Sequence, residues 1–372
     1  MTAAVGALCS VGYFLLALFG AAAFMRQGSP SADALTAPVS ILKPLKGTDP
    51  EMYSSLRSHF TQNYPEYELI FGVSEAEDPA LGIVERLRSE FPARTVRVVH
   101  CRQQLGANIK VSNLQQMVEH ASHALLIVND SDIRVPSDYV QRVTSPLADR
   151  NVGLVTCLYR GIAGGSIGSQ LESLQISTDF CPGVLAARQL EGIRFGLGST
   201  LAFRREDLDR IGGFGGLADY LADDYELGNR ISGLGLSVHL SEVVVETSLP
   251  AYSLKEFVAH QLRWARTIRA CRGNGYLGLV LTFGFFWALL TLLLSGGAGW
   301  AWLLLADVVG LRIAMALLIG RNLLGDRQLP RLLWLLPLRD LVAVVVWVGG
   351  FAGNRIYWRG EAFRLEAGKL VK

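Results

Sequence analysis

The chain has 372 residues, of which 50% are hydrophobic, and its mean hydropathy is positive at +0.30. This apolar content exceeds what a soluble enzyme needs, so we expect part of the chain to lie in a membrane. The net charge of +2 is small and no long basic run appears, which argues against nucleic acid as a partner. Five scattered cysteines without a CxxC pair disfavour a disulfide framework or a zinc site.

The first 25 residues are mostly apolar and uncharged, and Arg26 supplies the first positive charge. That length is enough to cross about 30 Å of hydrocarbon. A cleaved signal peptide would begin with a basic region, which residues 1–25 lack. We therefore predict a transmembrane helix over residues 1–26.

Residues 37–272 differ in character, because short apolar runs alternate there with amphipathic segments. This pattern is typical of βαβ units on a mainly parallel sheet, so we predict an α/β domain. The predicted strands are 39–45, 67–74, 96–101, 124–130 and 152–157, and the predicted helices are 49–60, 79–91 and 109–121. The loops that follow parallel strands meet at one edge of the sheet, where such folds bind ligands.

Membrane character returns in residues 273–354, which contain three apolar segments at 276–295, 299–320 and 332–353. The positive-inside rule places the central domain in the cytoplasm, because arginines flank it: Arg26, Arg263, Arg266, Arg269 and Arg272. If every segment crosses, the basic tail at residues 355–372 lies outside, against the same rule.

The last apolar segment contains Arg339 and Asp340, a pair that is costly in lipid. That segment could therefore be re-entrant or lie in the interface, and the number of crossings stays open.

Asp130 and Asp132 follow directly after the apolar run 124–128. On extended backbone, two acids separated by one residue point to the same side of a strand and can reach one metal ion. Mg²⁺ and Mn²⁺ prefer such oxygen ligands and keep part of their coordination for substrate phosphates. The alternative is an ordinary turn, which Asp-Ser-Asp also favours.

Asp78 follows the second predicted strand, where a carboxylate could accept the imide N–H of a uracil base or serve as a helix N-cap. In FGLGSTLAFRR, Gly198 and Ser199 allow backbone to approach a ligand, or form a turn within the core.

Four carboxylates crowd into the run from residue 219 to 226: Asp219, Asp223, Asp224 and Glu226. A solvated helix start explains such a run, because acids are favoured at helix N-termini. If the run faces the rim, repulsion and burial would raise one carboxylate's pKa and make it a base for an alcohol. Asp224 is the residue we assign to that role.

His260, Arg263 and Trp264 in HQLRW share one face of a predicted helix. Arg263 could neutralise a leaving diphosphate and Trp264 could stack on a sugar or acceptor. An interfacial amphipathic helix is the alternative.

Asp78, Asp130 with Asp132, Asp224 and HQLRW together resemble the D, D, D, (Q/R)xxRW pattern of inverting family 2-like glycosyltransferases with the GT-A fold. The resemblance is closer to the ceramide glucosyltransferase-like branch, through VSILKPLKG, EDPA, NDSDIRV, ADDYE and IYWRGEAFRL, and covers nearly the whole chain. Within it, the stretch 177–205 is most similar to bacterial hopanoid-biosynthesis glycosyltransferases, which are thought to transfer N-acetylglucosamine to bacteriohopanetetrol.

The resemblance implies a GT-A domain over residues 37–272 that transfers a sugar from a UDP-sugar to a lipid hydroxyl with a divalent cation. It implies Asp78 at the uridine, Asp130 at the metal-bound diphosphate, Asp224 as the general base, and Arg263 with Trp264 at the diphosphate and acceptor. We also assign Lys110, Asn113 and His260 to donor binding, and Gly198, Ser199 and Asp223 to the acceptor side. The expected location is the bacterial inner membrane, with the catalytic domain in the cytoplasm.

Two positions depart from the pattern. The animal ceramide enzyme has Gly where Asp132 stands, so the chain carries the fuller DxD motif, and His260 replaces the first Gln or Arg of (Q/R)xxRW. For the acceptor we favour a hopanoid with UDP-N-acetylglucosamine. The alternatives are ceramide or diacylglycerol with UDP-glucose, and a polyprenyl phosphate, which would want more basic residues at the rim than Lys43, Lys46 and Lys110.

Overall fold

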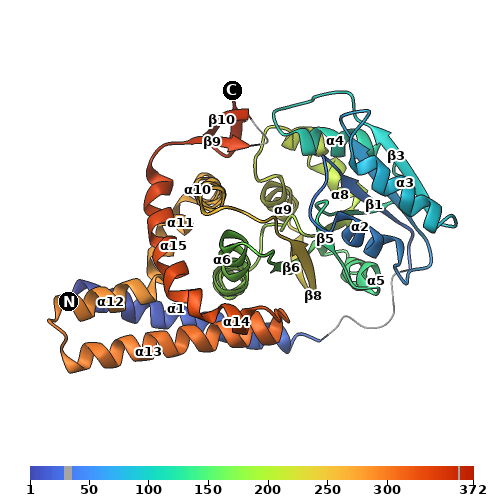
Figure 1. Cartoon of the computed structure of the whole chain (residues 1–372). Helices are drawn as coiled ribbons and strands as arrows, with labels where there is room; N and C mark the ends of the chain where they lie inside the picture. Colours follow the sequence, from blue (N-terminus) through green and yellow to red (C-terminus); the bar gives the residue numbers. More distant parts are fainter. Residues whose placement is uncertain (29–35, 359–360) are drawn as a thin grey trace.

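The computed structural model describes residues 1–28, 36–358 and 361–372. Its centre is a mixed eight-stranded sheet in the order β3-β2-β1-β4-β7-β6-β8-β5, with helices packed on it (Figure 1). The strands are β1 (Val39–Pro44), β2 (Tyr67–Val73), β3 (Thr95–His100), β4 (Leu125–Val128), β5 (Ile133–Arg134), β6 (Val152–Ile162), β7 (Leu201–Arg204) and β8 (Ser237–Ser248). The predicted α/β fold is confirmed.

The helices of this region are α2 (Met52–Phe60), α3 (Ala80–Glu90), α4 (Ile109–Val118), α5 (Tyr139–Thr144), α6 (Ile167–Gln175), α7 (Cys181–Glu191), α8 (Arg205–Arg210), α9 (Asp223–Gly233) and α10 (Leu254–Cys271). Short 3-10 turns lie at Ser145–Ala148 and Phe214–Leu217, and a π-helical turn, η2 (Ile176–Phe180), joins α6 to α7. All five predicted strands and all three predicted helices are present.

Alternate residues of each central strand enter different hydrophobic clusters. Ile41 of β1 packs into the cluster that contains α2, α3 and α5, whereas its neighbour Leu42 packs into the cluster that contains α4 and α9. Because side chains alternate across a strand, these two clusters cover opposite faces of the sheet. The near-continuous apolar runs of the sequence are therefore explained by burial on both faces.

The carboxyl ends of β1, β2 and β4 meet at one edge. β1 pairs in parallel with β2 and with β4, with Val39 opposite both Tyr67 and Leu125. The loops after Pro44, Val73 and Val128 consequently share one rim, as predicted. β7 then reverses the direction and pairs antiparallel with β4 and β6.

Within the described residues three helices are long and apolar enough to cross a membrane, and a bent helix pair makes a fourth if it counts as one span. They are α1 (Thr2–Met25), a bent pair made of Gly273–Thr282 and α12 (Gly284–Leu294), α13 with its π-helical extension (Gly299–Leu323), and the segment Leu329–Phe351, which contains α14 (Leu329–Leu332) and α15 (Leu336–Phe351). The predicted apolar segment at residues 276–295 falls on the bent pair, in which the chain bends by 52°.

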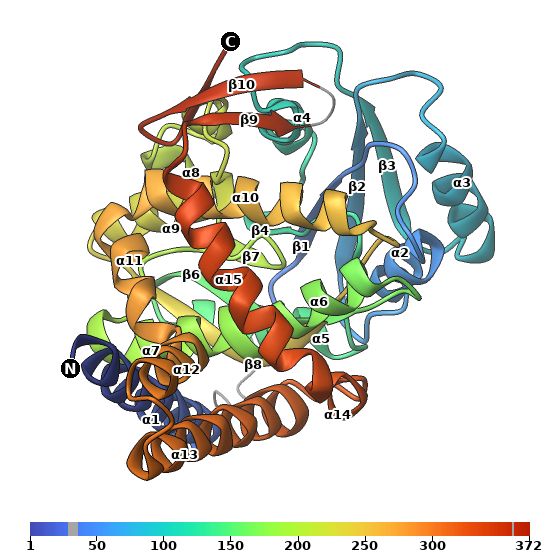
Figure 2. The same ribbon diagram turned by 60° about the vertical axis from the view of Figure 1, so that its left-hand side comes forward.

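The segment Leu329–Phe351 runs in a different direction from α1 and α13 in both views (Figures 1 and 2). α1 packs against α12 and α13 and also against α7, and α15 packs against α10 and α6 and also against α12. Just before this segment, Ser177 Oγ donates to Asp326 Oδ2 at 2.7 Å and Ala163 N donates to Gln328 Oε1 at 2.9 Å. Just after it, Arg269 Nη2 donates to the Gly353 carbonyl at 2.9 Å.

The tail forms a small antiparallel sheet of β9 (Arg355–Trp358), β10 (Glu361–Glu366) and β11 (Lys369–Val371). It docks on the segment before α9, where Leu370 N donates to the Asp219 carbonyl at 2.7 Å and Leu221 N donates to the Gly368 carbonyl at 3.2 Å. The tail therefore packs against the α/β domain.

Candidate active site

Lys110 holds the acids of the rim together. It stands in the first turn of α4, a helix whose N-cap residue Asn108 accepts a hydrogen bond from Val111 N. Its Nζ lies 2.8 Å from Asp130 Oδ1 and 3.1 Å from Asp223 Oδ2. Burial acts to lower the pKa of Lys110, but the surrounding carboxylates outweigh it and raise that pKa, so the ammonium is charged.

Gly198 brings backbone against the two central acids. Its N–H donates to Asp224 Oδ2 at 2.7 Å, and Tyr225 N donates to Asp224 Oδ1 at 2.8 Å. A Cβ at position 198 would lie 2.9 Å from Asp130 Oδ2 and 3.2 Å from Asp224 Oδ2. Asp130, Asp224 and Gly198 are thus in close proximity, and position 198 has no room for a side chain.

Burial, followed by the charge of Asp223, raises the pKa of Asp224 above its ordinary range. This agrees with the prediction that one acid of the run 219–226 titrates high. The other acids have partners: Asp223 pairs with Lys110, Glu226 with Arg230, and Asp219 accepts from Ala107 N. A carboxylate with a raised pKa beside open rim is suited to accept a proton from a hydroxyl.

Asp132 does not continue the strand that precedes Asp130. β4 ends at Val128 and the chain turns at Ser131 and Asp132, so the two acids do not stand on extended backbone as predicted. Asp132 Oδ2 accepts from Thr247 Oγ1 of β8, while Asp130 faces Lys110. Burial and the charge of Asp130 raise the pKa of Asp132 to about 6.

The donor set at this turn suits a divalent cation. Within the described residues no three His, Cys, Asp or Glu side chains converge as a complete metal site. Asp130 and Asp132 nonetheless supply two carboxylates. Burial, and then the charge of Asp130, raises the pKa of Asp132, and a bound cation would relieve the repulsion between the two acids. The Asp130 side chain is 42% exposed. Such a partial oxygen set matches Mg²⁺ or Mn²⁺ that completes its coordination with phosphates.

A buried polar network supports the turn from below, and only part of it was anticipated. Lys43 Nζ donates to the Asp130 carbonyl at 2.9 Å, and burial lowers the pKa of Lys43 to about 7 against the opposing effect of the nearby acids. Asn129 Nδ2 donates to Tyr139 Oη at 2.9 Å and to the Ser199 carbonyl at 2.6 Å. Lys43 is fully buried, so its assignment to the exposed rim is wrong.

Asp78 and Asn113 are less open to a ligand than the sequence suggests. The Asp78 carboxylate accepts from Gly47 N at 3.0 Å and from Ala80 N at 2.9 Å, which ties the loop after β1 to the start of α3. Asn113 Oδ1 accepts from Ser74 Oγ at 3.0 Å. Both side chains lie at the rim next to β1 and β2, and both are almost completely buried.

Helix α10 carries the HQLRW motif, and its start is fixed by a capping box between Ser253 and Glu256. His260 lies between Tyr252 and Trp264, with ring centroids at 5.6 and 5.3 Å, and Trp264 also contacts Phe180 at 6.0 Å.

His260 Nδ1 lies 2.9 Å from Oε1 of Glu172 on α6, a residue that the sequence gave no reason to select. Ser199 donates to the Cys157 carbonyl at 2.9 Å, so its hydroxyl is directed into the core and away from an acceptor.

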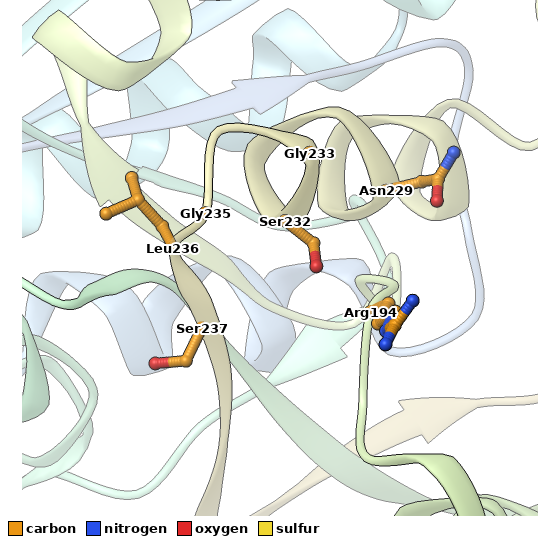
Figure 3. Close-up of a pocket in the computed structure, with 7 residues that line it drawn as sticks. All are labelled: Arg194, Asn229, Ser232, Gly233, Gly235, Leu236 and Ser237. Carbon is orange, nitrogen blue, oxygen red and sulfur yellow. The ribbon is translucent and has the colours of Figure 1, made fainter.

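One hollow of the described surface lies away from these residues. It has a volume of about 470 Å³ and lies at the carboxyl end of α9, beside Arg194, Ser232 and Ser237 (Figure 3). Asp223 and Asp224 are at the opposite end of the same helix, and a helix of 11 residues is roughly 16 Å long. This hollow therefore contains none of the predicted site residues.

Comparison with known families decides the class of protein. Residues 2–371 match the model of Glycosyl transferase family 21. The chain belongs to this family. It is a glycosyltransferase, and the resemblance drawn from the acidic motifs is confirmed at the level of the family.

Two relatives are similar over most of their length. Ceramide glucosyltransferase 3 of Caenorhabditis elegans is 25% identical, with 90% of this chain and 74% of that protein covered. Ceramide glucosyltransferase of Komagataella phaffii is 24% identical, with 88% and 82% covered.

Among solved structures, a mannosyltransferase from Pyrobaculum calidifontis in complex with GDP-Man and Mn²⁺ has a TM-score of 0.55 at 19% identity, covering 93% of this chain and 98% of that one. That likeness confirms the GT-A fold.

Proposed function

We propose that the protein transfers a sugar from a UDP-sugar to the hydroxyl of a membrane lipid, with inversion at the anomeric carbon. The observation that carries the proposal is Asp224, a carboxylate of raised pKa held by two backbone N–H groups beside the Lys110–Asp130 pair. The apolar helices attached to the same domain supply the argument for a lipid acceptor.

In the proposed reaction Asp224 removes the proton of the acceptor hydroxyl as its oxygen attacks the anomeric carbon. Asp130 and Asp132 would hold Mg²⁺ or Mn²⁺, which neutralises charge on the departing UDP. Arg263 adds positive charge at the diphosphate, and Trp264 offers an aromatic face to the sugar or acceptor. Lys110 keeps Asp130 and Asp223 in place during the reaction.

For substrates we propose UDP-glucose and a ceramide-type acceptor first, since the relatives above are ceramide glucosyltransferases. UDP-N-acetylglucosamine with a hopanoid remains the second candidate, on the sequence of residues 177–205. A polyprenyl phosphate is disfavoured, because Lys43 is buried and Lys110 is already paired with two acids.

The direct experiment incubates detergent-purified protein with UDP-glucose or UDP-N-acetylglucosamine and with ceramide, diacylglycerol, a hopanoid polyol or a polyprenyl phosphate. Mass spectrometry then identifies the product. A hexosylated neutral lipid is the expected result. Transfer only to the polyprenyl phosphate, or to none of the lipids, would contradict the proposal.

We further propose that three segments cross the membrane: α1, the bent pair and α13. The segment Leu329–Phe351 is bounded at both ends by contacts with the catalytic region, through Asp326 with Gln328 and through Gly353, so it lies along the membrane surface. The catalytic domain and the tail then face the cytoplasm of a bacterium together.

Labelling in intact cells with a membrane-impermeant thiol reagent tests this arrangement in a background without Cys9, which is exposed. A cysteine at Gly297, between α12 and α13, is expected to react, whereas a cysteine at Gly325 is expected to be protected. Reaction at Gly325 from outside would contradict the arrangement.

A further inference from the structure

Glu172 is a buried acid that the proposed mechanism does not use. It lies on α6, and its side chain is 2% exposed. Its carboxylate makes contacts of 2.9 and 3.0 Å to a single atom, Nδ1 of His260. Burying a carboxylate without a partner is costly, so this contact requires an explanation.

The contact fixes the protonation pattern of the imidazole. An ionised carboxylate only accepts hydrogen bonds, so the Nδ1–H group of His260 donates a hydrogen bond to Glu172. Nε2 is then the ring nitrogen that His260 can offer to a substrate, and which nitrogen of a histidine is available is commonly set by the partner of the other.

The ring is also held from its two sides. Tyr252 stacks on His260 with planes 22° apart, and Trp264 contacts it on the next turn of α10. Orientation by an acid and packing by two aromatic rings leave His260 little freedom.

We infer that Glu172 is a positioning residue for the transfer reaction: it orients His260 so that Nε2 faces the bound substrates. This inference rests on the proposed function. His260 occupies the first position of the (Q/R)xxRW motif. The inference adds to that motif a buried carboxylate that lies nearly 90 residues earlier in the sequence.

A double-mutant cycle tests whether Glu172 acts through His260. The variants are Glu172→Met, His260→Ala and the double variant, and the readout is kcat/KM for transfer to the acceptor identified for the wild type. We expect Glu172→Met to lower kcat/KM about 10- to 100-fold in wild type. In the His260→Ala background the same change is expected to have less than about a twofold effect.

Two further variants separate positioning from mere packing. Glu172→Gln keeps an oxygen that can accept from Nδ1, so it is expected to retain at least about a third of the activity. The matched control is Glu242→Gln. Glu242 lies on β8, five residues before Thr247, and its partly buried carboxylate pairs with Arg142. Thermal unfolding of every variant shows whether the fold survives.

The outcomes are distinct. If Glu172→Met is as damaging in the His260→Ala background as in wild type, or if Glu172→Met is active and Glu172→Gln is not, the positioning role is wrong. A wild-type protein that transfers no sugar to any lipid instead overturns the proposed function on which the inference rests.

Discussion

Two groups of acids and cations in this chain, one at the rim and one around Arg312, differ in charge balance. At the rim, Asp130, Asp223 and Asp224 share Lys110 as their principal cation. Beside the membrane helices, Arg312 pairs with Asp179 and Asp340 at 2.8 and 2.7 Å, and Arg339 lies 3.4 Å from Asp179. The second group has two acids and two arginines.

The difference in charge balance predicts different roles for the two groups. Burial, and after it the charge of neighbouring carboxylates, raises the pKa of Asp224 and of Asp132, and we propose Asp224 for proton transfer and Asp132 for a cation. The second group, with equal numbers of acids and arginines, is called the balanced group. It joins α13 and α15 to η2, and Phe180 of η2 contacts Trp264. We therefore expect substitutions at the rim to change activity, and substitutions in the balanced group to change stability.

The largest expected effect is that of Asp224→Asn. The amide cannot accept the acceptor's proton, so kcat should fall about 10²- to 10⁴-fold while the Kd for the UDP-sugar changes little. Steady-state kinetics and donor titration measure the two quantities. Asp138→Asn, at an exposed carboxylate before α5, is the control, and undiminished turnover of Asp224→Asn would exclude Asp224 as the base.

Arg312→Met should act on the balanced group and leave buried Asp340 without its main partner. Such a loss typically costs about 3–5 kcal/mol of unfolding free energy. Adding Asp340→Leu should restore most of the stability and retain transfer activity, measured by thermal unfolding in detergent and by product formation. A stable but inactive double variant would show that this group takes part in catalysis.

Gly198→Ala should lower activity about 10-fold or more, because the new Cβ would lie 2.9 Å from Asp130 Oδ2 and force the acids apart. Gly233→Ala is a matched control, since no atom outside its own helix lies within 4 Å of a Cβ there. Kinetics on both variants provide the test. Equal activity of the two variants would show that the close approach at Gly198 is not needed.

The smallest expected effect concerns Asp132→Asn and pH. Folding raises the pKa of Asp132 to about 6, so its ionised form disfavours the folded state above that pH. The variant should be more stable than wild type at pH 8, by roughly 1–2 kcal/mol, and the gain should disappear as pH falls toward 4. It should also need more Mg²⁺ or Mn²⁺ for activity. Equal unfolding temperatures at pH 8 would contradict the pKa assignment.

The elements that the sequence predicts well are those with a local signal. The strands β1, β2 and β4 appear as apolar runs, and their parallel order places Asp78 and Asp130 at one rim. Asp224 was found because four acids in a short run signal either a helix start or a reactive carboxylate. The run does start a helix, since α9 begins at Asp223, and the role of Asp224 as a base stays a prediction.

What the sequence could not predict depends on contacts between distant residues. Lys43 is an ordinary polar residue in a strand pattern, and only the packing of His59 and Asn129 around it shows that it is buried. The partner of Asp132 is Thr247, 115 positions later, so a local pattern cannot distinguish a turn from a strand end. Glu172 looks like a surface acid of α6 until α10 is placed on it.

The most direct test of the account is whether UDP binding depends on a divalent cation held by Asp130 and Asp132. Calorimetry with UDP on detergent-purified protein, with Mn²⁺ or with chelator, and on Asp130→Asn, measures this. We predict binding that is strong with Mn²⁺ and at least about 10-fold weaker with chelator or in Asp130→Asn. Equal UDP affinity under all three conditions would contradict the role given to the acidic rim.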